Sequence, residues 1–206
     1  MSERERSFVT LLESIADNKF VLGDRLVEVG VSGPNLEATL AAIAIAQGEL
    51  GHARHLYNWS FAIQGKQEEV REQTGKALPL LQQIHDWFSL IAGVYTFNVA
   101  TEIVLTRILR TGQPEVTTKL AKMMRELKEH ITFSRGWSVK MLNETGLIPK
   151  RYRAQLEKAA DAVGGWLREL ENADLEVSGA KVGVGEMAQE FSEQVARVMM
   201  AASASG

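Results

Sequence analysis

The hydrophobic residues of this chain recur every three or four positions, and this spacing predicts α-helices. Three of the four prolines, Pro34, Pro114 and Pro149, follow turn-forming residues, as prolines at helix starts do. A stretch with three glycines, 178–185, is expected to be a linker, and no Asn-Gly hairpin signal suggests a strand. We therefore expect six helices, over 2–29, 35–64, 76–110 with a bend or an interruption near Pro79, 114–144, 149–172 and 186–201.

The connections between these helices predict how they are arranged. The first and second helices are joined by a short turn, as are the third and fourth, and short connections produce antiparallel neighbours. The longer polar stretch 65–75 can cross from one helical hairpin to the other. We therefore expect an all-α fold, a ferritin-like four-helix bundle over about 2–145. A helical extension over about 149–206, ending in a frayed tail, would complete a single domain of 206 residues.

Each of the four bundle helices carries polar residues in the middle of its apolar stripe. Counting outward from the two short turns places these residues at similar heights along the bundle. A charge buried without a partner costs several kcal/mol, so these groups must pair with one another or bind something. The sequence therefore predicts one buried polar centre with six members, which are Lys19, Glu49, His52, Glu102, Glu126 and His130.

The pair Glu49-x-x-His52 has the spacing of a metal-ligand pair in di-iron and di-manganese carboxylate bundles. Oxygen and nitrogen ligands suit a dinuclear Fe or Mn centre. In that case the ligands would be Glu49, His52, Glu102, Glu126 and His130.

Two substitutions oppose a metal centre. Leu127 stands where a second Glu-x-x-His pair would begin, and Lys19 stands where a carboxylate is expected. A lysine ammonium cannot ligate a metal, but it can replace a cation between Glu49 and Glu102. A metal-free centre is therefore the favoured interpretation, and the dinuclear Fe or Mn site is the alternative.

Composition excludes several other classes of protein. With 23 basic and 26 acidic residues and no basic block, the chain lacks the charge pattern of a nucleic-acid-binding protein. The absence of cysteine removes disulfides and thiolate metal sites. The N-terminus has no export signal, and the longest apolar run is too short to cross a bilayer. We therefore expect a cytoplasmic protein that is not embedded in a membrane.

Four stretches, 16–26, 49–54, 105–109 and 133–137, give the chain a family resemblance. They resemble the ferritin-like subunits of the bacterial phenylacetyl-CoA epoxidase, a multicomponent monooxygenase, and most of all its PaaC-type subunit. The resemblance covers about 8–144. It departs from the PaaC-type pattern at His52, where glutamine is frequent, and at Glu102, where an apolar residue is expected.

The resemblance implies a function that the residues alone do not give. In that family one subunit type holds the di-iron centre and the substrate, and the PaaC-type subunit is a structural partner that has lost metal ligands. The implied role is a non-catalytic subunit of a complex that epoxidises the ring of an aromatic acyl-CoA such as phenylacetyl-CoA. It would need no cofactor of its own and would bind a catalytic ferritin-like subunit, form a homo-oligomer, or both. The alternative is a metal-competent oxygenase of the same superfamily.

Overall fold

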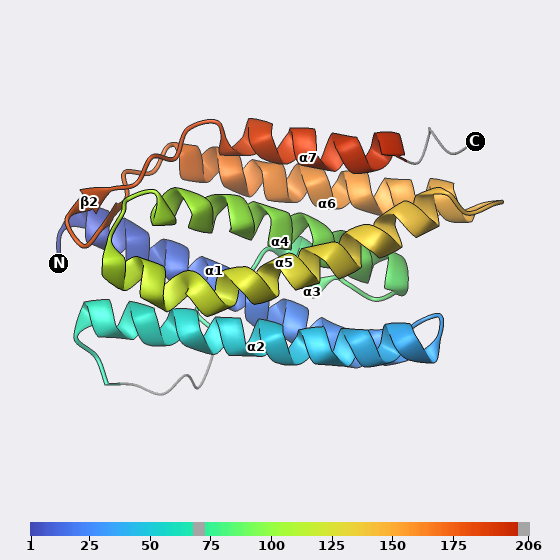
Figure 1. The fold of residues 1–206 in the computed structure, drawn as a ribbon, viewed down its shortest axis with the longest axis horizontal. Helices are drawn as coiled ribbons and strands as arrows, with labels where there is room; N and C mark the ends of the chain where they lie inside the picture. The colour runs from blue at the N-terminus through green and yellow to red at the C-terminus, as the bar shows by residue number, and fades with distance from the viewer. Residues whose placement is uncertain (68–72, 202–206) are drawn as a thin grey trace.

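The computed structural model describes residues 1–67 and 73–201, and within them the regular secondary structure is helical apart from one very short hairpin (Figure 1). The elements in chain order are α1 (Glu3–Glu28), η1 (Gly30–Ser32), α2 (Leu36–Gln64), α3 (Pro79–Gln82), α4 (Trp87–Leu109), α5 (Pro114–Leu142), α6 (Ile148–Glu171), β1 (Glu176–Val177), β2 (Ala180–Lys181) and α7 (Met187–Ala201). The predicted all-α fold is confirmed.

The first hairpin, α1 with α2, is bounded by capping residues. Ser2 and Glu5 form a capping box at the start of α1, and the Asn35 side chain accepts a hydrogen bond from Ala38 N at the start of α2. The two helices approach closely at Gly23, because a Cβ there would lie 2.7 Å from the Leu50 side chain. Only glycine allows this contact, so Gly23 helps to set the distance between the helices.

The second hairpin pairs α4 with α5, and α4 is the central helix of the molecule. Among the described residues it is the only helix long and apolar enough to cross a membrane, with a mean hydropathy of 1.5. However, 83% of that apolar window is buried inside the protein, as expected for a core helix. The helix Trp87–Leu109 is therefore no indication of a membrane protein.

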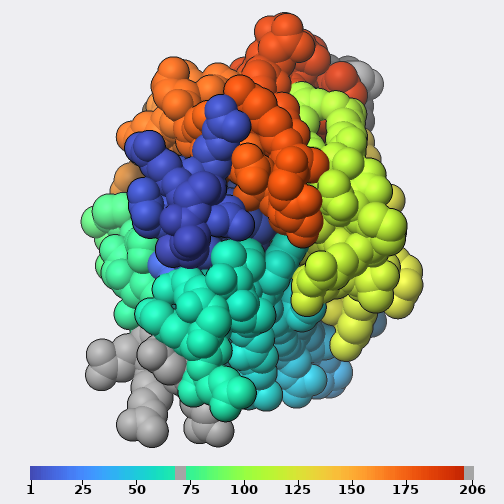
Figure 2. Space-filling model, turned by 90° about the vertical axis from the view of Figure 1, so that its left-hand side faces the viewer, coloured from blue at the N-terminus to red at the C-terminus, as the bar shows by residue number. Residues whose placement is uncertain are grey.

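The C-terminal helices cover the side of α4 that faces away from the first hairpin. In Figure 1, α6 and α7 form the upper layers, α4 and α5 lie in the middle, and α1 and α2 lie below. Figure 2 views the molecule from the end where the chain begins, and the N-terminal end of α1 lies there between the C-terminal segments and α2. An ion pair of 2.5 Å between Arg4 and Asp174 joins α1 to the segment after α6.

Two predicted elements differ in detail from the structure. The expected helix over 76–110 is interrupted near Pro79 as predicted, because Pro79 begins a separate short helix and Asp86 caps the start of α4. The expected linker 178–185 contains part of an antiparallel hairpin, whose turn places Ser178 and Gly179 at positive φ values of 49° and 79°. Residues 68–72 of the expected crossover and the tail 202–206 lie outside the described residues.

Candidate functional site: a buried polar centre

Three side chains from three helices form what we call the inner half of the polar centre: Lys19 of α1, Glu49 of α2 and Asn98 of α4. All three are fully buried. Lys19 Nζ lies 2.8 Å from Glu49 Oε2 and donates to Asn98 Oδ1 at 2.5 Å. Asn98 Nδ2 in turn donates to Glu49 Oε1 at 2.8 Å. The amide of Asn98 therefore satisfies the lysine and the carboxylate together.

The ionised state of Glu49 depends on its neighbours. Burial alone raises the pKa of Glu49, but Lys19 and His130 outweigh it, and the pKa falls well below the usual carboxyl range. Burial lowers the pKa of Lys19, and Glu49 opposes that shift. The geometry of Lys19 and Glu49, 2.8 Å from Nζ to Oε2, is that of a buried ion pair.

Three further side chains form the outer half of the centre: His52 of α2, and Glu126 and His130 of α5. His130 Nδ1 lies 2.7 Å from Glu49 Oε1, and His52 Nε2 lies 2.9 Å from Glu126 Oε2. The imidazole rings of His52 and His130 stack with centroids 5.3 Å apart. Because each carboxylate accepts, the bonded nitrogens are donors, and His52 Nδ1 and His130 Nε2 are left without protons when the rings are neutral.

The surroundings of His52 in the outer half keep its imidazole neutral. Burial lowers the pKa of His52 to about 4, and the positive charge of Lys19 contributes. Burial raises the pKa of Glu126, but the hydrogen bond from His52 outweighs it and the pKa falls. The side chain of Glu126 is one third exposed to solvent, and its Oε1 also lies 3.5 Å from Lys122 Nζ. Within the outer half, His52 is therefore a neutral imidazole that donates to the partly solvated carboxylate of Glu126.

A cleft of about 770 Å³ between α2 and α5 leads to the outer half. Its wall includes His52, Glu126 and His130 together with Gly48. A Cβ at Gly48 would lie 2.7 Å from His130 Nε2, so only glycine leaves room for this ring position. The absence of a side chain at Gly48 lets the imidazole of His130 lie against the backbone of α2 and reach Glu49.

The structure brings five of the six predicted residues together, and Glu102 is the exception. Among the described residues Glu102 has no hydrogen bond or ion pair with the centre, and the expected bridge from Lys19 to it is absent. Burial raises the pKa of Glu102, with Lys128 and Glu190 as its charged neighbours. Asn98, one turn earlier on the same stripe, occupies the place expected for Glu102.

Two residues beside Lys19 have a role that the sequence pattern did not indicate. The fully buried carboxylate of Asp17 accepts hydrogen bonds from the Tyr57 hydroxyl and from the backbone N–H groups of Thr74 and Lys76. The Asn18 side chain accepts another, from the N–H of Leu78 at 2.7 Å. We call Asp17 and Asn18 the crossover anchor, because they hold the described end of the crossover against α1.

A dinuclear carboxylate centre needs one Glu from each of two helices and a Glu-x-x-His pair from each of the other two. Here Glu49, His52 and His130 offer ligand atoms within 4.8 Å of one another, a possible metal site. The remaining three positions hold residues that cannot supply a carboxylate, namely Lys19, Asn98 and Leu127. Because an ammonium already lies against Glu49, the donor set does not fit a dinuclear metal centre.

Comparison with known proteins gives two consistent matches. The profile of one family, described as phenylacetic acid catabolic protein, matches residues 1–205. The chain is also 28% identical over 151 residues to the C subunit of 1,2-phenylacetyl-CoA epoxidase from Escherichia coli (strain K12). That alignment covers 70% of this chain and 61% of the relative, so the chain matches about three fifths of the relative's length.

Proposed function

The chain belongs to the phenylacetic acid catabolic protein family, and we propose that it is a PaaC-like structural subunit of a multicomponent monooxygenase. The complex would epoxidise the ring of an aromatic acyl-CoA such as phenylacetyl-CoA, in the catabolism of phenylacetate. The chain would not be catalytic alone. The similarity to the C subunit of a phenylacetyl-CoA epoxidase supports this role.

One observation carries the proposal: the Lys19 ammonium lies 2.8 Å from Glu49 Oε2, at the centre of the bundle. Glu49 is the only carboxylate in the inner half. Its Oε1 accepts hydrogen bonds from Asn98 and His130, whereas its Oε2 has no hydrogen bond among the described residues and lies in ion-pair contact with Lys19 Nζ. The cation that the carboxylate needs is therefore supplied by the chain itself. We infer that the subunit works without a metal of its own.

The proposed role also implies partners and a location. A structural subunit acts by binding the catalytic ferritin-like subunit, which would hold the acyl-CoA, and a homo-oligomer of this chain is compatible with that arrangement. The similarity to one named subunit of an epoxidase makes a partner subunit plausible. A cytoplasmic location, where acyl-CoA substrates are found, remains part of the proposal.

One atom favours the alternative, a metal-competent oxygenase. His52 Nδ1 is buried and has no hydrogen-bond partner among the described residues. A buried acceptor without a partner is costly, and a metal ion would satisfy it. A single free ligand atom does not offset the three substituted ligand positions, but it makes metal content the decisive measurement.

The test is metal analysis of the chain purified from cells grown with excess iron and manganese. We expect far less than one Fe or Mn per wild-type chain and no epoxidation of phenylacetyl-CoA by the chain alone. Two metals per wild-type chain would overturn the proposal. Lys19→Glu, checked for folding by circular dichroism, is expected to gain metal, and Lys158→Glu on the exposed side of α6 is the matched control.

A further inference from the structure

Three cationic side chains line a pocket of about 320 Å³ at the end of the molecule that Figure 2 faces. Arg107 and Arg110 come from the C-terminal end of α4, and Lys181 comes from β2. The opposite wall is the segment 183–186, which Figure 2 shows in orange-red beside the yellow-green turn from α4 to α5. We call this site the cationic pocket. Ligand sites in proteins begin at about 300 Å³, so the cationic pocket has room for one small ligand.

The side chain of Arg107 is held in place but has a donor to spare. Its Nη2 donates to Glu190 Oε2 at 2.9 Å and to the carbonyl oxygen of Gly185 at 3.4 Å. Only 14% of the side chain is exposed. Its Nε is buried and has no hydrogen-bond partner among the described residues. A buried guanidinium donor without an acceptor is costly, so an oxygen atom supplied by a ligand would stabilise it.

The other two cations of the pocket are available to a ligand. Arg110 is exposed and forms no ion pair with any residue that the structure describes. Lys181 Nζ lies 3.2 Å from Asp174 Oδ1, but both side chains are largely exposed, and such a pair is worth little. Glu186 is the only acidic residue among those that line the pocket. The lining is therefore positively charged.

The pocket also lies next to the start of α7. Gly185 and Glu186 immediately precede Met187, the first residue of that helix. Glu186 has a φ of 62°, a conformation that non-glycine residues seldom adopt, and this turn leads the chain into the helix. A helix start carries a partial positive charge. The Glu171 side chain already accepts from the N–H of Ala188, so the helix adds to the potential while the arginines supply the contacts.

We propose that the cationic pocket binds the diphosphate group of a small anionic ligand. A guanidinium presents paired N–H donors that match the spacing of phosphate oxygens, and two arginines with one lysine suit a group that carries several negative charges. A single carboxylate would neutralise only one of the three cations. The diphosphate can be free or part of a nucleotide such as ADP. The pocket shares no residue with the polar centre, and the proposal does not depend on the function of that centre.

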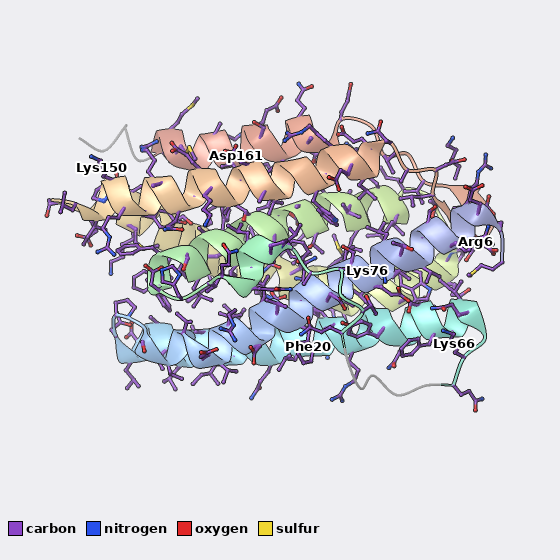
Figure 3. All side chains as sticks on the ribbon, turned by 180° about the vertical axis from the view of Figure 1, so that it is seen from behind. Arg6, Phe20, Lys66, Lys76, Lys150 and Asp161 are labelled. Carbon is purple, nitrogen blue, oxygen red and sulfur yellow. The ribbon has the colours of Figure 1, made fainter. Side chains whose placement is uncertain are left out.

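The experiment is isothermal titration calorimetry of inorganic pyrophosphate into the purified full chain, at pH 7.5 and low salt. We expect a Kd of about 100 μM or lower. Arg110→Glu is expected to raise the Kd at least about 10-fold, through the loss of a charge-assisted contact. Lys150→Glu makes the same change in net charge at the opposite end of the molecule from the β1–β2 hairpin (Figure 3). As the matched control, it should leave the Kd unchanged.

A variant of opposite sign separates binding from stability. Glu186→Gln removes the acid from the lining and is expected to lower the Kd for pyrophosphate about 3-fold, which a loss of fold cannot do. ADP is titrated in parallel. Tighter binding of ADP than of pyrophosphate would support a nucleotide as the ligand, and equal or weaker binding would support a free diphosphate.

Two results would overturn the proposal. One is the absence of binding by both compounds at ligand concentrations up to about 1 mM, well above the expected Kd. The other is binding that Arg110→Glu leaves as tight as in the wild type, because the ligand would then lie elsewhere. Circular dichroism melts of all variants show whether a weaker affinity reflects a loss of fold.

Discussion

The inner and outer halves of the polar centre contain similar groups but differ in their access to water. In the inner half, Lys19 and Glu49 are fully buried, and each loses its counter-charge if the other is removed. In the outer half, Glu126 is partly exposed, so water can replace its protein partners. The comparison indicates that the inner half determines the stability of the bundle, whereas Glu126, the exposed end of the outer half, can vary at little cost.

Removal of the buried cation should have the largest effect. Lys19→Met leaves the carboxylate of Glu49 buried without a counter-charge, and we expect a loss of about 3–5 kcal/mol in the free energy of unfolding. Urea denaturation at pH 7 measures it. The double variant Lys19→Met with Glu49→Gln removes both charges and should be less destabilised than Lys19→Met alone. Equal stability of wild type and Lys19→Met would mean that the two halves do not differ.

Acid should destabilise the protein through His52. The pKa of His52 is about 4 in the folded protein and 6.5 ordinarily, so the unfolded chain takes up the proton first as the pH falls. The stabilisation is therefore complete above pH 6.5 and is lost as the pH falls towards 4, by about 3 kcal/mol from a shift of this size.

Urea denaturation from pH 7.5 to pH 4.5 measures this dependence. Carboxylates titrate in the same range, so the informative quantity is the difference between the wild type and His52→Gln, which cannot protonate. We expect the stability of His52→Gln to fall less steeply with decreasing pH. Parallel curves for the two proteins would show that His52 is not the group responsible.

The smallest effect should come from the exposed end of the outer half. Glu126→Gln removes a charge but retains an oxygen that can accept the hydrogen bond from His52. Because a partly solvated ion pair is worth little, we expect a change of at most about 1 kcal/mol at pH 7. A loss as large as that of Lys19→Met would remove the distinction between the halves.

The helices could be predicted from the sequence wherever their boundaries carried strong local signals. Asn35 caps α2 and Pro114 begins α5, and both starts were placed within a residue of those observed. The interruption expected near Pro79 ends at Asp86, which forms a capping box with Ser89. The sequence did not show where α4 begins, because the apolar spacing continues across the break. The Ser178-Gly179 turn was a weaker signal, in a stretch too short to show a strand pattern.

The sequence predicted which faces of the helices form the polar centre, but on α4 it placed the polar residue one helical turn from the one observed. Lys19, Glu49, His52 and His130 interrupt apolar stripes, and that alone indicated a buried polar centre. Asn98 and Glu102 lie on the same face of α4 one turn apart, so the stripe cannot distinguish them. The tilt of α4 against α1 decides which of the two reaches Lys19, and tilt is a property of packing between helices.

The crossover anchor has a consequence for how the protein opens. Asp17 and Asn18 hold the backbone around Thr74 and Leu78, and the next residue, Lys19, belongs to the polar centre. One turn of α1 thus connects a surface segment to the middle of the bundle. Release of that segment would leave the buried carboxylate of Asp17 without its backbone hydrogen-bond donors. The end of the crossover should therefore belong to the same cooperative unfolding unit as the core helices. Hydrogen exchange at the amides of Thr74 and Lys76 would then be as slow as global unfolding, although neither amide lies in a helix.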